Sequence, residues 1–412
     1  MINVTTHRLG NGLIVLHHYN AATRMAALNL LYKVGSADEQ PQHTGLAHLL
    51  EHLMFTGSKG APSFDGPLQA AGGVSNAWTN VDVTNFYDIV PAHNIDTAMW
   101  LERDRLLNLN LNDDSIALQK SVVIEEFKQR YLNRPYGDIL HLLDGLAYKV
   151  HPYRWPTIGL STDDIADMPK DAITDFHKHY YSVNNLILCI AGNINVDRAV
   201  ALAERYFGDI EPAEPAISDR PAEPEQTEPR QLVRHSDTVP ANLIIRAYHM
   251  CDRLSPDFPA ADLLSDILSN GPSSRFMRGA LMKSGMFSEL EASVAGVDDP
   301  GLFFVRAYLT DGTPIERAQQ AIDDELKRLL DDGPTPDEVT KYANKFISTQ
   351  TFENIGYHTK AARLCKFEQR SAAEDINREP LLYRAVTADD ITRVARQILR
   401  PTNCSSILYL KD

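Results

Sequence analysis

Two histidines and a glutamate stand at helical spacing in one short apolar segment near the start of this 412-residue chain. His52 follows His48 by four residues, which is about one helical turn, and Glu51 lies between them. Two imidazoles one turn apart can bind a single zinc ion, and the carboxylate between them then lies close enough to act on a zinc-bound water molecule. The spacing therefore predicts a metal site with hydrolytic chemistry.

The surrounding residues predict a buried helix that carries this motif. Leu46, Leu49, Leu50 and Leu53 recur at the spacing of one helical stripe, and the polar residues fall on the neighbouring stripe. Burying several ionisable groups together is costly unless a partner satisfies them. The alternative is an accidental spacing of two hydrogen-bonded core histidines, and a suitable third ligand downstream favours the metal site over that alternative.

A catalytic zinc site needs a third protein ligand and leaves one position open. We assign the third ligand to Glu126, within a second predicted helix at about residues 113–132, because Glu126 shares a helical face with Val122 and Val123. Its neighbour Glu125 falls on a more polar face of the same helix. The alternative is that both are solvated surface glutamates, as most glutamates are.

These motifs together resemble those of the pitrilysin/insulinase family of zinc peptidases, the inverted zincins, whose signature is H-x-x-E-H. Further matching segments are residues 9–13, 72–79 and 191–193. The resemblance covers the whole chain and is strongest in residues 1–210. Length and motif order are similar to the short, two-domain bacterial branch that is related to mitochondrial processing peptidase.

The resemblance implies a role for each motif residue. It implies that His48, His52 and Glu126 bind one Zn²⁺ per chain and that Glu51 is the general base. The activity implied is that of a zinc metallo-endopeptidase, which hydrolyses oligopeptides or unfolded segments. A peptide is the expected substrate.

A strand beside the motif helix is the expected substrate-binding element. It contains Asn76, Ala77 and Trp78, and in the family the corresponding strand edge pairs with the peptide backbone. Pairing of this kind gives affinity with little sequence specificity. The alternative is an ordinary sheet strand with no part in binding.

Two departures from the family pattern concern activity. Family members often carry a glutamate seven residues before the third ligand, where this chain has Gln119. Active relatives also place an arginine and a tyrosine in the half without metal, where Leu281 and Ser288 stand here. Arg275 and Arg278 precede that segment and are expected to face solvent or to pair with acids.

These departures leave open how the chain assembles and whether it acts alone. The resemblance implies a dimer around the zinc cleft, with a non-identical family subunit as the candidate source of the missing arginine and tyrosine. A competing hypothesis is a non-catalytic or partner-dependent structural subunit of the same family. A more distant one is a chaperone-like peptide binder with structural zinc.

The overall composition is that of a water-soluble globular protein. A net charge of −15 argues against nucleic acid and anionic membranes as partners, and no apolar run is long enough to span a membrane. The cysteines are scattered without C-x-x-C spacing: Cys189, Cys251, Cys365 and Cys404. No secretory signal opens the sequence, so the expected compartment is the cytoplasm, or the periplasm if a signal peptide has been removed.

The sequence divides into two halves around a proline-rich segment. Residues 211–230 contain five prolines, which predicts a stiff, extended linker between a zinc-binding peptidase domain at 1–210 and a second domain without metal at 231–412. An Ile-Thr pair at Ile173 recurs at Ile391, 218 residues later, and other matches share this offset. At about the same offset an apolar helix recurs without histidines.

The order of predicted strands and helices gives the fold class. We expect an α+β protein of two similar domains, each a largely antiparallel sheet with helices packed on one face.

Overall fold

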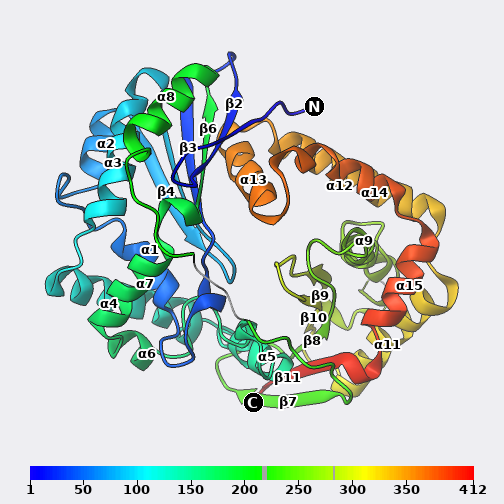
Figure 1. Cartoon of the computed structure of the whole chain (residues 1–412). Coiled ribbons are helices and arrows are strands. Elements are labelled where there is room, and N and C mark those ends of the chain that lie inside the picture. The colour runs from blue at the N-terminus through cyan, green and yellow to red at the C-terminus, as the bar shows by residue number, and fades with distance from the viewer. Residues whose placement is uncertain (216–219, 282–283) are drawn as a thin grey trace. The chain divides into compact units, whose positions relative to one another are not determined.

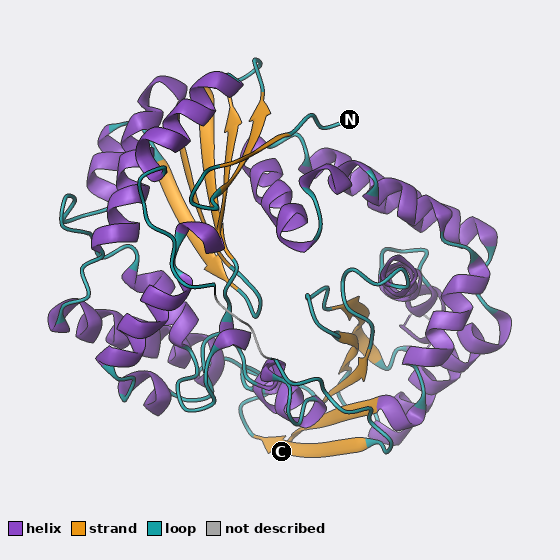
Figure 2. Cartoon of the chain, in the orientation of Figure 1, coloured by secondary structure: helices purple, strands orange, loops and turns teal. Residues whose placement is uncertain are grey.

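The chain folds into two compact units, each built around one β-sheet, in a computed structural model that describes residues 1–215, 220–281 and 284–412 (Figures 1 and 2). Unit 1 consists of Met1–Lys128, Trp155–Arg220 and Gln350–Glu379. Unit 2 consists of Gln129–Arg154, Pro221–Thr349 and Pro380–Asp412.

The sheet of unit 1 has six strands in the order β1-β2-β6-β3-β5-β4. They are β1 (Thr5–Arg8), β2 (Ile14–Tyr19), β3 (Met25–Tyr32), β4 (Val74–Thr79), β5 (Thr84–Pro91) and β6 (Leu186–Gly192). Only the β2–β6 pair is parallel. β6 is an unbroken apolar run and is buried along its whole length, as a central strand covered on both faces must be. β4 pairs only with β5 among the described residues and forms an edge of the sheet.

Helices cover both faces of the sheet of unit 1. The helices that unit 1 takes from the first half of the sequence are α1 (Leu46–Leu53), α2 (Asp65–Ala70), α3 (Ile95–Asn108), α4 (Asp113–Phe127), α6 (Thr162–Ala166), α7 (Lys170–Tyr180) and α8 (Val196–Phe207). Of these, α1, α2, α3 and α8 pack on the sheet, and α4 packs on α1. The second face is covered by α13 (Tyr357–Arg370), whose Leu364 and Cys365 pack against Leu31 and Cys189 of the sheet. Helices on a single face were expected, and α13 adds the layer that makes β6 fully buried.

Unit 2 contains a five-stranded sheet in the order β7-β11-β8-β10-β9, again with one parallel pair, β7–β11. Its strands are β7 (Arg230–Ser236), β8 (Leu243–His249), β9 (Phe287–Val294), β10 (Leu302–Leu309) and β11 (Cys404–Lys411). Its helices are α5 (Ile139–Ala147), α9 (Phe258–Ser269), α11 (Ile315–Asp332), most of α12 (Pro336–Glu353) and α14 (Glu379–Ala385), and α15 (Ala388–Ile398). The core lies between the sheet and α9, α11 and α15.

The compact units do not coincide with the two halves of the sequence. Among the described residues, the strands of unit 1 precede the expected boundary at residue 210, and the strands of unit 2 follow residue 229. Each unit nevertheless takes a helix from the other half: α13 belongs to unit 1 and α5 to unit 2. The reason is burial, because each of these helices has an apolar stripe that packs on the sheet of the unit it joins.

The described parts of the predicted linker at 211–230 are anchored, whereas an unpacked connector was expected. Residues 216–219 lie outside the described residues. Within unit 1, Arg220 pairs with the buried carboxylates of Asp38 and Asp82 at 3.1 and 2.8 Å. Within unit 2, Gln226 is buried and donates to the carbonyl of Cys404 at 2.9 Å. Prolines stiffen the segment, but polar side chains attach it to each unit.

The structural repeat predicted from the sequence is present. β6 begins at Leu186 and β11 at Cys404, and α7 begins at Lys170 and α15 at Ala388, in each case 218 residues apart. The fold is α+β with two related units, and both sheets are largely antiparallel.

Candidate metal centre

Helix α1 presents His48 and His52 side by side. Its four leucines are buried at 3% exposure or less, so they fix the face that the helix turns to the core. The histidines follow on the adjacent stripe and are partly exposed, with ring centroids 4.8 Å apart. The leucine pattern therefore orients both imidazoles toward one point.

A buried carboxylate anchors the start of α1. Glu39 accepts hydrogen bonds from the backbone amides of Gly45 at 2.9 Å and Ala47 at 2.8 Å, and so satisfies donors that a helix N-terminus leaves free. Gly45 has φ +88°, a left-handed conformation that favours glycine. Burial raises the pKa of Glu39 well above its ordinary value, and the helix amides oppose that rise.

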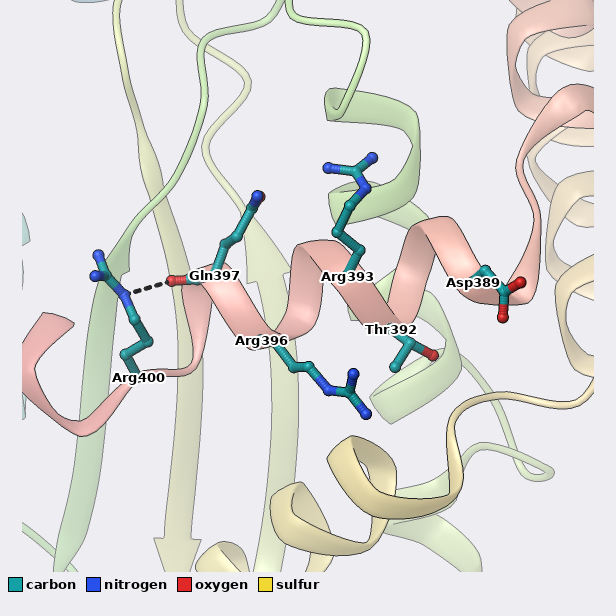
Figure 3. Close-up of a pocket in the computed structure, with 6 residues that line it drawn as sticks. All are labelled: Asp389, Thr392, Arg393, Arg396, Gln397 and Arg400. Carbon is teal, nitrogen blue, oxygen red and sulfur yellow. Dashed lines mark hydrogen bonds between the residues drawn. The ribbon is translucent and has the colours of Figure 1, made fainter.

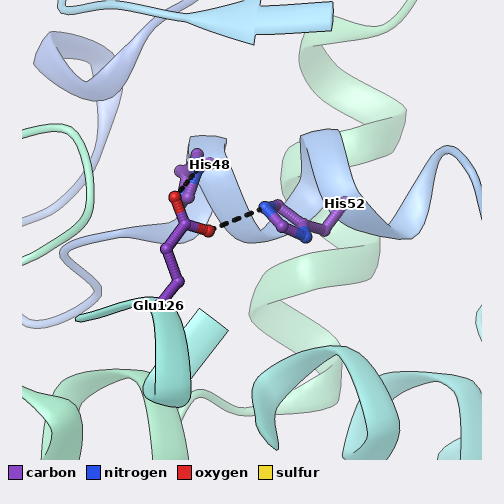
Figure 4. Close-up of side chains that lie close together, drawn as sticks. All are labelled: His48, His52 and Glu126. Carbon is purple, nitrogen blue, oxygen red and sulfur yellow. Dashed lines mark ion pairs between the residues drawn. The ribbon is translucent and has the colours of Figure 1, made fainter. Parts of the chain in front are cut away.

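Glu126, near the end of α4, completes the cluster (Figure 4). Its carboxylate oxygens lie 3.9 Å from His48 Nε2 and 3.3 Å from His52 Nε2. These three residues form the one group of possible metal ligands found among the described residues, with ligand atoms all within 4.8 Å of one another.

The neighbouring Glu125 points elsewhere. Its side chain is 62% exposed and pairs with Lys128 at 2.7 Å. The preference for Glu126 was argued from Val122 and Val123, and only Val123 lies on a buried face; Val122 is 42% exposed. The part of the argument that used Val122 is wrong, because the buried residues of α4 are Ile116, Val123 and Phe127, and Val122 lies outside that face.

The donor set fits zinc. Zinc in proteins takes imidazole nitrogens and carboxylate oxygens at about 2.0–2.2 Å, so two ligands of a tetrahedral site lie about 3.4 Å apart. The separations of 3.3 and 3.9 Å between Glu126 and the two imidazoles are close to this value. Two nitrogens and one oxygen on two packed helices can therefore hold a zinc ion after small side-chain adjustments, and one coordination position is left for water or substrate.

Glu51 lies beside the cluster and is not one of its converging ligands. Its residue exposure is 9%, and its Oε2 accepts a hydrogen bond from the hydroxyl of Thr79 at the end of β4. A buried carboxylate next to a metal site can take a proton from water in the site. The position of Glu51 is therefore suited to general-base chemistry.

The predicted substrate residues Asn76, Ala77 and Trp78 lie on β4, at the edge of the sheet. Successive side chains of a strand alternate between faces. Ala77 shares the face of Thr79 and Glu51, whereas Trp78 lies on the other face, where the Lys366 ammonium of α13 stands 4.5 Å from its ring centroid. The strand edge adjoins the candidate metal centre, but the indole of Trp78 faces away from it.

Arg275 and Ser288, two of the residues singled out in the second half, have structural partners. Arg275 pairs with Glu338 at 2.9 Å and donates to the carbonyl of Gly333 at 2.7 Å. Ser288 lies in β9, and its hydroxyl donates to the carbonyl of Tyr308 at 3.3 Å. Two residues of the segment that contains Leu281 and Ser288, residues 282–283, lie outside the described residues.

Sequence reasoning missed Glu39 and Thr79. Thr79 belongs to the strand predicted from the sequence, and period-two alternation with Ala77 is a signal that could have placed its hydroxyl toward Glu51. Glu39 lies in a loop six residues before Gly45, and no periodicity marks it. Its role depends on a loop conformation that only the structure reveals.

A hollow of about 650 Å³ on α15 of unit 2 is a second candidate, and two of its three arginines are held in ion pairs (Figure 3). Its lining residues are Asp389, Thr392, Arg393, Arg396, Gln397 and Arg400. Arg393 makes a two-pronged ion pair with Asp257 at 2.7 and 2.9 Å, and Arg400 pairs with Glu225 at 3.0 Å. Arg396 donates to the carbonyl of Leu330 at 3.2 Å, so all three arginines of the hollow already have partners within the unit.

None of the described helices combines the length and apolar character needed to cross a membrane.

Comparison with known proteins identifies the family. Residues 14–146 match the model described as insulinase (peptidase family M16), and residues 167–346 match the peptidase M16 inactive domain. The chain is 31% identical to the zinc protease PqqE of Helicobacter pylori, over 98% of this chain and 91% of that protein. It is 25% identical to an uncharacterized zinc protease of Rickettsia felis, over 100% and 98% of the two chains.

A solved structure agrees with this comparison. The crystal structure of a protease from Helicobacter pylori superposes with a TM-score of 0.93 at 26% identity, covering 99% of this chain and 100% of that one. The chain therefore belongs to the M16 family of peptidases.

Proposed function

We propose that the chain is a zinc metallo-endopeptidase that hydrolyses oligopeptides or unfolded segments. The observation that carries the proposal is the convergence of His48, His52 and Glu126 beside the buried carboxylate of Glu51. The names of the relatives as zinc proteases support zinc as the metal. One zinc per chain is proposed, held by the two imidazoles and the carboxylate.

Each residue then has a defined task. A bound zinc ion would polarise the peptide carbonyl and lower the pKa of water in the site. Glu51 takes a proton from the attacking water molecule and delivers it to the leaving amine. Asn76, Ala77 and Trp78 offer the free edge of β4, and backbone hydrogen bonds along that edge hold the peptide extended.

Peptide cleavage with and without chelator tests the proposal. We expect the purified, zinc-loaded chain to cleave a mixed peptide library and a denatured protein, to lose activity with the chelator, and to regain it with zinc. The variant Glu51→Gln should bind zinc and cleave nothing. Cleavage that persists both in chelator and in Glu51→Gln would reject a zinc- and Glu51-dependent reaction.

A partner-dependent subunit is the second candidate function. It is favoured by Leu281 and Ser288, which stand where active relatives are expected to carry arginine and tyrosine. We propose a dimer, and light scattering on the pure chain measures its mass. Full turnover by a homodimer would exclude the need for a different subunit, and full turnover by a monomer would exclude the dimer as well. Zinc binding without cleavage would favour the partner-dependent role.

A further inference from the structure

We propose that Thr79 is the positioning residue of the general base, and that its hydroxyl holds Glu51 in the orientation that proton transfer requires. This inference rests on the proposed function, because it concerns the residue assigned there as the base. The hydroxyl of Thr79 donates to Glu51 Oε2 and so joins the last residue of β4 to helix α1.

The hydrogen bond from Thr79 limits the motion of the Glu51 carboxylate, which is its acceptor. Glu51 is a long side chain with several rotamers, and its carboxylate lies in a largely buried site. A hydrogen bond to an ionised carboxylate is roughly twice as strong as one between neutral groups. One such bond to Oε2 restricts the rotation of the carboxylate. The direction of its lone pairs is then set before substrate binds.

The neighbouring threonine determines which way the Thr79 hydrogen points. Thr84 Oγ1 donates to the carbonyl of Val34 at 3.0 Å, and it lies 3.4 Å from Thr79 Oγ1. A hydroxyl carries only one hydrogen. Thr84 has used its own hydrogen on Val34, so the hydrogen between the two threonines belongs to Thr79. The closer and negatively charged Glu51 is the better acceptor for it.

The backbone that carries Thr79 is held by a tight hairpin turn. Thr79 and Thr84 are the last paired residues of β4 and β5 before that turn. Inside the turn, Asn80 Oδ1 accepts hydrogen bonds from the amides of Asp82 at 2.9 Å and Val83 at 2.8 Å. The turn therefore has little freedom to move the hydroxyl.

A second loop clamps the same turn. The amides of Ser36 and Ala37 donate to the carbonyls of Asn80 at 3.1 Å and Val81 at 2.8 Å. A Cβ on Gly35 would lie 2.5 Å from the backbone of the turn, so this close approach requires glycine. The ion pairs of Arg220 with Asp38 and Asp82 join the loop to the turn. Thr79 is thus presented to Glu51 from a rigid frame.

The consequence is a link between the substrate strand and the base. The strand edge proposed to bind the peptide ends in the residue that holds Glu51. A small misplacement of a catalytic group can slow a reaction strongly without weakening substrate binding. Loss of the Thr79 hydroxyl should therefore lower kcat and leave KM nearly unchanged.

Three variants of the full chain test this inference. Kinetics would use a quenched fluorescent peptide selected from the cleaved library. For Thr79→Val, which keeps the side-chain shape and removes the donor, we expect a fall in kcat of roughly 10- to 100-fold, with KM within about threefold of wild type. Zinc content and Tm should stay close to wild type. Thr79→Ser restores the donor and should recover most of the lost kcat.

Ser75→Ala is the matched control. Ser75 lies on the same face of β4, and its hydroxyl donates to Asp65 at 3.1 Å and not to the base. Its removal should leave kcat unchanged. A wild-type kcat in Thr79→Val, or an equal loss in Thr79→Ser, would overturn the inference. Loss of zinc or a collapse of Tm in Thr79→Val would show a structural role and overturn it too.

A readout without turnover separates this inference from the proposed function. Crystal structures of metal-free Thr79→Val and Thr79→Ser should differ at Glu51, with a displaced carboxylate in the valine variant and the wild-type orientation in the serine variant. An unmoved Glu51 in Thr79→Val would overturn the positioning role. Failure of the zinc-loaded wild type to cleave any peptide would defeat the proposed function, and the crystal comparison would still decide the role of Thr79.

Discussion

The two units of this chain carry related helices in the same place of the structural repeat, and the polar residues of those helices meet different partners. In unit 1, His48 and His52 of α1 converge with Glu126 of α4 within 4.8 Å. All three offer atoms that accept a metal ion. The arrangement is a set of ligands gathered around one point.

In unit 2 the corresponding residues satisfy one another. Asp266 and Asn270 follow His48 and His52 by 218 residues, on α9 and at its end. Asn270 Nδ2 donates to Asp266 Oδ1 at 2.6 Å, and the ammonium of Lys345 on α12 donates to Asn270 Oδ1. In unit 2 the positive charge beside these residues is therefore the ammonium of Lys345, a side chain of the protein itself.

The comparison shows that one fold can carry either a set of converging metal ligands or a hydrogen-bonded polar cluster at the same position of the repeat. The repeat preserves helices and strands, since these depend on apolar periodicity shared by both halves. Metal binding depends on a few polar residues that converge. In unit 2 an acid and an amide, Asp266 and Asn270, stand in place of the two imidazoles and form a hydrogen-bonded cluster with Lys345. Fold similarity alone therefore does not predict a metal site.

The largest expected effect concerns the base. Glu51→Gln should lower turnover by about 10²-fold or more while zinc stays bound, because the amide cannot accept a proton. Ser269 follows Glu51 by 218 residues, and its hydroxyl donates to the carbonyl of Ala292 in unit 2. Peptide cleavage assays should find Ser269→Ala as active as wild type. Equal losses in the two variants would remove the functional distinction between the units.

The next effect separates two adjacent glutamates of α4. Glu126→Ala removes a ligand and should weaken zinc binding by more than the 10- to 100-fold that loss of an outer-shell partner costs. Glu125→Ala breaks only a surface pair with Lys128 and should change the zinc Kd by less than about threefold. Competition with a chromophoric chelator measures both constants. A similar loss in the two variants would exclude Glu126 as the distinct third ligand.

The smallest effect concerns stability and pH in unit 2. Burial raises the pKa of Asp266 to about 6, the negative charge of Asp262 adds to the rise, and Asn270 and Lys345 oppose it. Because the folded pKa lies above the unfolded value, the stability contributed by the protonated carboxyl is complete below about pH 4. It is lost as the pH rises toward 6.

Asp266→Asn keeps an acceptor for Asn270 and removes this titration. The variant should match wild type at pH 4 and exceed it by roughly 1–2 kcal/mol in free energy of unfolding at pH 7, allowing for partial exposure of the site. Urea denaturation of the metal-free proteins at both pH values measures the difference. A variant less stable than wild type at pH 7 would show that an ionised Asp266 is needed beside Lys345.

Local patterns were enough to predict helix α1 and the strand that contains Asn76, Ala77 and Trp78. The leucine stripe gives the limits of α1 closely, and the predicted helix at 113–132 corresponds to α4 and the helical turn that follows it. Such features depend on neighbours three or four residues apart, which the sequence displays directly. The prediction of His48, Glu51 and His52 as site residues rests on the same short-range spacing.

Long-range contacts could not be predicted in this way. Helix α13 packs on the sheet of unit 1, where Cys365 and Cys189 lie in the same hydrophobic core. The apolar periodicity of an amphipathic helix does not predict which sheet the helix will cover. The anchoring of α1 by Glu39 and the contact of Thr79 with Glu51 depend on loop and turn conformations. Such conformations depend on contacts between distant parts of the folded chain and not on the spacing of residues along the sequence.

The central claim is that unit 1 holds the metal and unit 2 does not, and metal analysis of purified protein tests it most directly. Elemental analysis after dialysis against zinc and then metal-free buffer should find one zinc per chain in wild type and in Asp266→Asn. It should find none in the double variant His48→Ala, His52→Ala, provided that circular dichroism shows the variant folded. Stoichiometric zinc in that folded double variant, or two zinc ions in wild type, would contradict the account.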